Sequence, residues 1–472
     1  MSFYKPLSLF SRFRLVLSAF QQQDGLPFSN VLNEEQIDEA FAQEDALFAQ
    51  EEEDVYKPSL TLWAFLSQIL HKKEQRSCAA AVARVVVLLV ALGRKPCSDN
   101  TGDYCRARAK LPEKVLERLT IQAAARLERQ ISKSWLWHGR HVKLVDGTTV
   151  TMPDTQANQD VYPQQPQQKK GLGFPIARMV VLLSIATAML SGMEMGPYEG
   201  KETGEMALFR QLLEQLESGD IVVADRYYCS YFMIALLLEL GVDFVVRLHQ
   251  CREADFRRGR RLGHEDHITT WIRPDRPDWM DKATYQRMPR TLRVRELKVH
   301  VHEPGFRTES LVVVTTLTDA KRYSRDDIAE LYRKRWLVEL DIRDIKVTLG
   351  MDDLRCKTPE MVRKEIWTCL LAYNLIRQTL AQSAQRHGLS PRQLSFTAAM
   401  QKVAASWSQL SMVNDELALR LIESNLEQMA GHLIGKRPNR VEPRAVKRRP
   451  KPLPLLTKPR KKAIAELLAG KI

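Results

Sequence analysis

The sequence lacks the features that would indicate a disulfide-stabilised or membrane-spanning protein. Its seven cysteines are scattered, odd in number and never spaced as C-x2-C, which argues against a disulfide framework and a zinc ribbon. Its apolar runs are shorter than the ~18–20 residues needed to span a bilayer, and no N-terminal stretch has the order of a signal peptide. We therefore expect reduced thiols, no membrane partner and a cytoplasmic location.

Common nucleotide-binding and hydrolase motifs are absent as well. The chain contains no G-x4-G-K-[ST], no H-E-x2-H and no G-x-S-x-G, so a nucleotide-driven or serine-hydrolase activity has little support. What is present is an ordinary globular composition, with 44% hydrophobic and 27% charged residues in a chain of 472. This length predicts several domains.

Positive charge is concentrated at one end of the chain. The whole sequence carries +14, and Lys436–Lys462 alone contains twelve basic residues and one acid. Six prolines between Pro438 and Pro459 exclude a continuous helix there. We expect a flexible arm that follows DNA phosphates through residues such as Arg448 and Arg449; a solubilising extension is the alternative.

Negative charge is concentrated near the other end. The segment Asn33–Tyr56 contains ten acids and no base. A solvated helix face or linker explains such a segment, whereas an inhibitory mimic of DNA has little support.

Hydrophobic periodicity divides the chain into helical ends and an α/β centre. Strand-like runs alternate with helical ones in the centre, which predicts a layered α/β core. Two Arg-dense, β-rich runs interrupt this alternation and predict a mostly β insertion subdomain. The expected regions are a helical N-terminal region that binds DNA (1–139), the first part of the core (140–249), the insertion (250–322), a helix completing the core (323–355), a helical C-terminal region (356–435) and the basic tail (436–472).

Two local patterns within the core refine this division. Ala177–Leu190 is either a buried strand or a short buried helix, since periodicity cannot distinguish them. Ser324 and Asp327 have the spacing of a capping box, and we expect the helix that they begin to run to about Leu349.

Four polar residues share one face of this predicted helix. At ~100° per residue, Tyr332, Arg335, Glu339 and Lys346 fall within an arc of about 60°. The other faces are apolar, so much of the helix should be buried, and a buried carboxylate needs a strong partner. A divalent cation is such a partner.

Two further carboxylates end predicted strands. Asp146 follows an alternating run and Asp225 a short apolar run, at the strand ends where ligands of open α/β sheets collect. With Glu339 they make three converging acids that could bind Mg²⁺, and two such ions can activate a nucleophile and stabilise the leaving oxygen of a phosphodiester. Arg335, Lys346 and the Tyr332 phenol would then hold phosphates.

Each acid also has a simpler interpretation. Asp146, followed by Gly147, could be a turn residue, and Asp225 could pair with Arg226 or cap a helix. Glu339 could form a helical salt bridge with Arg335 or Arg343. We favour the metal interpretation because the three acids occur together with the polar helix face.

These residues resemble those of a known family, the bacterial insertion-sequence transposases of the IS-four family. The helix matches their Y-x2-R-x3-E-x6-K signature, and the two aspartates with Glu339 are similar to their DDE triad. The resemblance covers roughly residues 100–450. It is carried by the segments Tyr332-Arg-Lys-Arg335-Trp-Leu-Val-Glu339-Leu-Asp-Ile-Arg-Asp-Ile-Lys346, Val145-Asp146-Gly147-Thr148 and Ala224-Asp225-Arg226-Tyr227.

The resemblance implies a fold and an activity. The fold is a ribonuclease-H-like catalytic core with a β insertion before the glutamate helix, flanked by helical regions. The activity is cleavage at the ends of the protein's own element and transfer into target DNA, with Asp146, Asp225 and Glu339 binding two Mg²⁺ ions and Mn²⁺ as an alternative ion. It also implies terminal inverted repeats as partners, a homodimer on two ends and a nucleoid-associated location.

Tryptophans are candidates for further DNA contacts. Trp336 within the signature and Trp271 in the insertion could contact DNA, and Trp271 or Trp279 could stack on an unpaired base. Packing in a core is the more common role of each.

Two competing functions remain open. Glu296-Leu-Lys298 mimics the E-x-K of restriction-type endonucleases, which would make the chain a nuclease of another class, although this leaves the helix signature unexplained. A catalytically silent DNA-binding regulator derived from a transposase is the second alternative.

Overall fold

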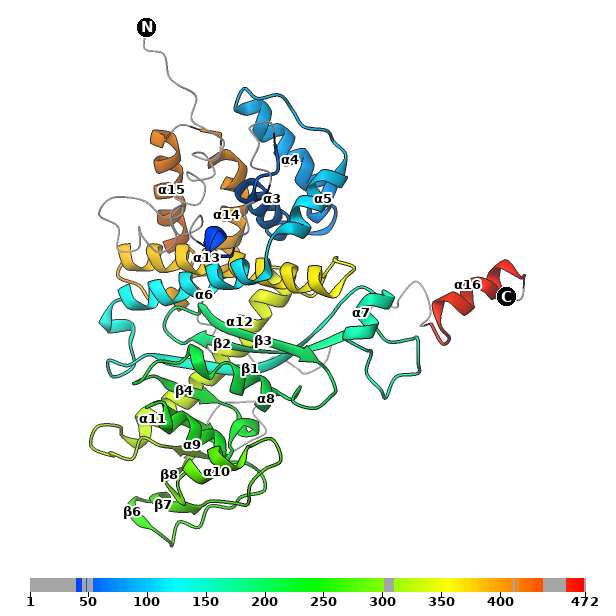
Figure 1. Cartoon of the computed structure of the whole chain (residues 1–472). Coiled ribbons are helices and arrows are strands. Elements are labelled where there is room, and N and C mark those ends of the chain that lie inside the picture. The colour runs from blue at the N-terminus through cyan, green and yellow to red at the C-terminus, as the bar shows by residue number, and fades with distance from the viewer. Residues whose placement is uncertain are drawn as a thin grey trace. The chain divides into compact units, whose positions relative to one another are not determined.

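The computed structural model describes residues 40–44, 48, 54–300, 310–410, 412–413, 415–435 and 456–470 (Figure 1). Its internal contacts divide the chain into two compact units, each built from three separate segments. The helical unit comprises Met1–Gly139, Leu183–Gly192 and Glu339–Ile434, and the sheet unit comprises Arg140–Leu182, Met193–Val338 and Gly435–Ile472. Arg448, Arg449 and most of the acidic segment lie outside the described residues.

The sheet unit is organised around a mixed sheet of nine strands in the order β3-β2-β1-β4-β5-β9-β8-β7-β6. Strands β1, β4 and β5 are parallel to one another. The pairs β5–β9, β9–β8, β8–β7 and β7–β6 are antiparallel. The strands are β1 (Val142–Thr151), β2 (Ile176–Ser184), β3 (Leu190–Pro197), β4 (Ile221–Ala224), β5 (Asp243–Arg247), β6 (Arg260–Gly263), β7 (Asp266–Ile272), β8 (Thr291–His300) and β9 (Ser310–Thr315).

Central strands of this sheet are buried on both faces. All four residues of β4 are buried, which is why this segment is an apolar run without alternation. The first four residues of β1 are buried as well, including Lys143. The run Ala177–Leu190, ambiguous in the sequence, forms most of β2, a turn, and the start of β3. The expected α/β core is therefore present as a mixed sheet with helices.

The helices of the sheet unit are short, and several of them connect its strands. Several begin after a capping side chain, for example Thr155 before α7 and Asp281 before α10. They are α7 (Gln156–Val161), α8 (Glu205–Gln211), α9 (Tyr231–Glu239), α10 (Lys282–Arg287), α11 (Arg325–Arg333) and α16 (Arg460–Leu468), with short 3₁₀ turns η3 (Leu213–Gln215), η4 (Arg226–Tyr228) and η5 (Lys334–Trp336).

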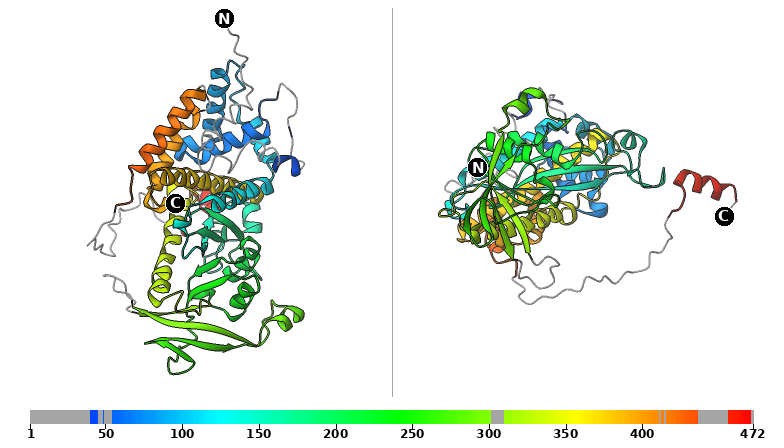
Figure 2. Two further views of the ribbon diagram at one scale, coloured as in Figure 1. Left: turned by 90° about the vertical axis from the view of Figure 1, so that its left-hand side faces the viewer. Right: turned by 90° about the horizontal axis from the view of Figure 1, so that it is seen from below.

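The β insertion continues the central sheet instead of forming a separate one. Strand β9 pairs with β5, aligning Thr315 with Val245, because β5 would otherwise leave one edge unpaired. One hydrophobic core runs from Val222 on β4 to Trp271 and Leu292 in the insertion. The insertion strands, light green in Figure 2, thus extend the sheet.

The helical unit is built around one long helix. Helix α13 (Pro359–Arg386) buries most of its residues and lies beside α6 (Glu113–Gln130) (Figure 1). The other helices are α3 (Pro58–Ile69), α4 (Cys78–Ala91), α5 (Thr101–Lys110), α12 (Leu337–Arg343), α14 (Phe396–Leu410) and α15 (Asp415–Ala430), with 3₁₀ turns η1 (Lys73–Arg76), η2 (Lys133–Trp135) and η7 (Pro391–Gln393). No helix in the described ranges is long and apolar enough to cross a membrane.

The helix expected from Ser324 to about Leu349 starts as predicted but is not a regular α-helix. Ser324 and Asp327 form a capping box at its start. The backbone then tightens to 3₁₀ at η5, returns to α in α12, and widens to a π-segment, η6 (Asp344–Thr348). Since turns of different width rotate the side chains by different angles, the predicted arc of about 60° does not hold over the whole segment.

A buried ion pair in the insertion gives a test of the fold. Nε and Nη2 of Arg295 donate to Oδ1 and Oδ2 of Asp266 at 2.8 and 2.6 Å, and Nη1 donates to the Tyr323 carbonyl at 2.7 Å. We expect Asp266→Ala to lower the free energy of unfolding by about 3–5 kcal/mol, because it leaves a buried charge without its partner. Urea unfolding followed by Trp271 fluorescence measures the loss. Asp103→Ala, which breaks the exposed pair with Arg106, should cost less than about 1 kcal/mol, and equal losses in both variants would contradict the prediction.

Candidate active site

The register of two parallel strands places two carboxylates side by side. Leu144 on β1 aligns with Val223 on β4, and continuing this register by two residues aligns Asp146 with Asp225. Adjacent strands lie about 4.8 Å apart, and aligned residues point to the same face. The two predicted acids therefore meet within the sheet unit, at the carboxyl end of β4.

Backbone amides fix the orientation of both carboxylates. The Gly147 amide donates to Oδ1 of Asp146 at 2.8 Å, and the Tyr227 amide donates to Oδ1 of Asp225 at 2.7 Å, so that Asp225 caps η4. The cap role considered for Asp225 is thus real. Asp146, in contrast, is the fifth residue of β1 (Val142–Thr151), so it lies neither in a turn nor at the end of its strand as expected. Each carboxylate keeps its second oxygen for another partner.

Burial and neighbouring acids make Asp146 a weak acid. The pKa of Asp146 is raised to about 6, chiefly by burial and in part by the nearby carboxylates of Asp225 and Glu205, which outweigh the lowering by the Gly147 amide and Arg335. The Arg335 guanidinium lies 3.9 Å from Oδ2 of Asp146. The site thus concentrates negative charge that one guanidinium only partly neutralises.

Tyr332 and Arg335, from the predicted signature, belong to the same site. Tyr332 is buried, and burial raises the pKa of its phenol to about 12, with Asp225 raising and Arg335 and Arg247 lowering it. Tyr332 lies near the end of α11 and Arg335 follows three residues later in η5. Tyr332 interacts electrostatically with Asp225, and Arg335 with Asp146. The sheet unit therefore brings together Asp146, Asp225, Tyr332 and Arg335.

Glu205 is a third acid of this site, and the sequence analysis did not identify it. It is the first residue of α8, and the Tyr228 hydroxyl donates to its Oε2 at 3.4 Å. Burial raises the pKa of Glu205, Arg178 lowers it and Asp225 raises it. A Cβ at Gly147 would collide with the Glu205 side chain, so the glycine after Asp146 makes room for this acid. No motif marks Glu205, because its role depends on how α8 packs.

Glu339 and Lys346 of the signature belong to the helical unit. Glu339 lies in the first turn of α12, four residues after Arg335 along the helical segment. Lys346 lies in the π-segment, where its ammonium is 3.3 Å from Oδ1 of Asp352. Trp336, the last residue of η5 in the sheet unit, is half exposed.

Trp271 and Glu296 form a buried pair, which disfavours two sequence-based interpretations. The Trp271 indole is buried and donates to Oε1 of Glu296 at 2.8 Å, so its ring is not available for stacking on a base. His267 is also buried and hydrogen bonded to Glu296. Lys298 pairs with Glu265 instead of completing an E-x-K site. These residues form the interior of the insertion.

The donor chemistry of the Asp146–Asp225 pair suits a divalent cation. Within the described ranges, no group of three or more His, Cys, Asp or Glu side chains is arranged to hold a metal ion. Mg²⁺, however, is commonly held by one or two carboxylates, with water and phosphate oxygens as its other ligands. Two oriented carboxylates on neighbouring strands fit that requirement.

Comparison with known proteins agrees with this chemistry. The family model of the transposase DDE domain matches residues 137–375. The chain is 27% identical over 402 residues to transposase InsG for insertion sequence element IS4 of Escherichia coli (strain K12), covering 83% of this chain and 85% of that protein. It is 22% identical over 288 residues to a probable transposase for insertion sequence element IS5377 of Geobacillus stearothermophilus, covering 61% and 69%. A solved piggyBac transposase synaptic complex with hairpin DNA is 10% identical, with 90% of this chain and 86% of that chain covered and a TM-score of 0.42. The chain therefore belongs to the transposases of this DDE-domain family, as its resemblance to the insertion-sequence transposases predicted.

Proposed function

We propose that this DNA transposase cuts the ends of its own insertion sequence and joins them to target DNA by a cut-and-paste route. The observation that carries the proposal is the alignment of Asp146 and Asp225 on adjacent parallel strands, with Arg335 and Tyr332 beside them. A catalytically silent regulator would have no need for carboxylates held so close together, because their mutual repulsion and burial destabilise the fold.

We further propose a ribonuclease-H-like core. The strand order β3-β2-β1-β4-β5, with β4 and β5 parallel to β1, supports it. In this interpretation β9 to β6 are an insertion joined to the far edge of the core sheet.

The proposed catalytic acids are Asp146, Asp225 and Glu339, which would bind two Mg²⁺ ions, with Mn²⁺ as an alternative. When bound, these ions would activate the attacking water or 3′-hydroxyl and stabilise the leaving oxygen. The guanidinium of Arg335 and the phenol of Tyr332 would bind and orient the scissile phosphate from the side of Asp146 and Asp225. We assign Lys346 to a neighbouring phosphate.

DNA contacts outside the acidic site complete the proposal. The half-exposed Trp336 is better placed for contact with DNA than the buried Trp271, and Trp279 is a partly exposed aromatic in the insertion. Arg448 and Arg449 would follow the backbone of the terminal inverted repeats or of the target. A homodimer would hold two ends together.

Replacement of the three acids tests the proposed triad. We expect Asp146→Asn, Asp225→Asn and Glu339→Gln each to lower Mg²⁺-dependent cleavage at least about a thousandfold, since each removes part of one catalytic unit. The substrate is duplex DNA carrying the inverted repeats that flank the coding region, and cut ends are measured on denaturing gels. DNA binding, measured by gel shift, should persist.

Two matched variants control for loss of any glutamate. Glu330→Gln removes an exposed acid of α11, and Glu296→Gln removes the buried acid of the E-x-K alternative. Both should retain cleavage when folded. Loss of cleavage in Glu296→Gln alone would favour a nuclease of another class, and a wild-type protein that binds the ends without cutting them would favour the regulator.

The raised pKa of Asp146 predicts a dependence of stability on pH. The folded-state pKa of about 6 exceeds the ordinary value of 3.8, so ionisation of Asp146 destabilises the metal-free fold as the pH rises through this range. We expect Asp146→Asn to raise the melting temperature at about pH 7.5, by a margin that shrinks towards about pH 4. Adding Mg²⁺ should stabilise the wild type and not the variant.

Calorimetry of metal-free and Mg²⁺-loaded protein measures this effect. Asp154→Asn, which changes an exposed aspartate in the same unit, is the control and should alter neither the pH dependence nor the response to Mg²⁺. A melting temperature of Asp146→Asn at or below that of the wild type at about pH 7.5 would contradict the predicted sign.

A further inference from the structure

Behind the helix that carries Glu339 lies a buried ionic cluster. Asp341 follows Glu339 by two residues in α12, so the two side chains point in nearly opposite directions, about 200° apart around the helix. Asp341 is 1% exposed. A carboxylate so deeply buried requires charged partners from neighbouring elements.

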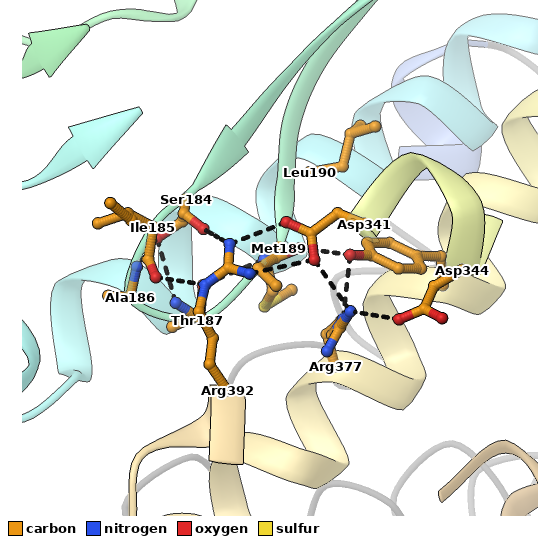
Figure 3. Close-up of polar contacts among 12 residues, drawn as sticks. Ser184, Ile185, Ala186, Thr187, Met189, Leu190, Asp341, Asp344, Arg377 and Arg392 are labelled. Atoms are coloured by element: carbon orange, nitrogen blue, oxygen red, sulfur yellow. Dashed lines mark hydrogen bonds and ion pairs between the residues drawn. The ribbon is translucent and has the colours of Figure 1, made fainter. Parts of the chain in front are cut away.

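Two arginines supply these partners (Figure 3). Arg392 of η7 bonds both oxygens of Asp341, at 3.1 and 2.8 Å, in a bidentate pair. Arg377 of α13 donates to Oδ1 of Asp341 at 3.1 Å and to Oδ2 of Asp344 at 3.0 Å. Two cations and two anions balance the charge of the cluster.

The same cluster holds the turn that joins β2 to β3. Arg392 donates to the carbonyls of Ser184 and Ile185, and the Tyr373 hydroxyl, which accepts from Arg377, donates to the carbonyl of Ala188 at 2.8 Å. The turn backbone, which includes Ala188 at φ +62°, is thus bonded by side chains of α13 and η7.

The turn is also packed and bonded at its far end. Asn374 of α13 bonds both the amide and the carbonyl of Leu190, at 2.9 Å each. Ala186 and Met189 pack into a small apolar core formed with α6 and α13. The cluster therefore connects α12 to a rigid support instead of to solvent.

The two aspartates grip the helix on both sides of its change in geometry. Asp341 lies in α12, and Asp344 is the first residue of the π-segment, where the turn widens. Since one guanidinium, that of Arg377, bonds both, the rotation of the helix about its axis is fixed at this transition. Where the number of residues per turn changes, the direction of a side chain no longer follows from regular helix geometry, so tertiary contacts have to set it.

We propose that Asp341, held by Arg377 and Arg392, is a positioning residue that fixes the rotation of α12 about its axis and therefore the direction of the Glu339 side chain. The inference rests on the proposed catalytic role of Glu339. The buried Val338 and Ile345 also constrain this segment by packing. The bidentate pair adds directional bonds, which keep good geometry only over a narrow range of helix rotation. Asp341 acts through the helix and does not touch substrate.

The test compares two buried aspartates, Asp341→Asn and Asp266→Asn. Both lose one charge from a bidentate pair with an arginine and both should lower the melting temperature. With the flanking-repeat duplex, assayed well below both melting temperatures, only Asp341→Asn should lower cleavage about 10–100-fold and raise the half-saturating Mg²⁺ concentration about tenfold or more. Gel-shift affinity for the duplex should not change.

Parallel variants separate the possible failures. If Glu339→Gln still cuts DNA, the proposed triad fails; if it does not cut and Asp341→Asn matches Asp266→Asn in rate and Mg²⁺ dependence, the positioning role is overturned. Should Asp341→Asn fail to fold, Arg392→Lys, which keeps the charge and loses the bidentate geometry, decides the question. A raised Mg²⁺ requirement in Arg392→Lys supports the role, and wild-type Mg²⁺ dependence overturns it.

Discussion

The alignment of β1 with β4 is the constraint on which the rest of the candidate site depends. Parallel pairing of Leu144 with Val223 determines that Asp146 and Asp225 lie side by side on one face of the sheet. A shift of the pairing register by one residue would place the two carboxylates on opposite faces. The buried residues on both strands hold this register, because a slip would move them away from the neighbours against which they are packed. Hydrophobic packing thus determines the position of the polar chemistry.

That chemistry is held together against its own repulsion. Burial and neighbouring carboxylates oppose the ionisation of Asp146, whereas Arg335 and the Gly147 amide favour it. The sheet unit therefore contains a strained charge distribution that a bound cation would relieve. Stability and function act in opposite directions at this point, as is usual where charged groups are gathered for catalysis.

The sequence predicted the elements of the site better than their surroundings. Asp225 could be predicted because it follows the apolar strand β4, Asp146 because it lies in a run typical of a strand, and Ser324 because a capping box is local. Glu205 could not be predicted, since its proximity to Gly147 arises from the packing of α8. The burial of Trp271 depended in the same way on a partner, Glu296, that lies on a different strand. Local patterns are readable, and contacts between distant segments are not.

The interleaving of the two units has a consequence for synthesis of the chain. Helices α6 and α13 pack together, yet residues 131–358 separate them. A ribosome that stops before Pro359 releases a polypeptide whose α6 exposes Leu116, Leu119 and Leu127, which α13 would otherwise help to bury. Such a fragment would be prone to aggregation and proteolysis, so the chain becomes stable only after α13 has been synthesised.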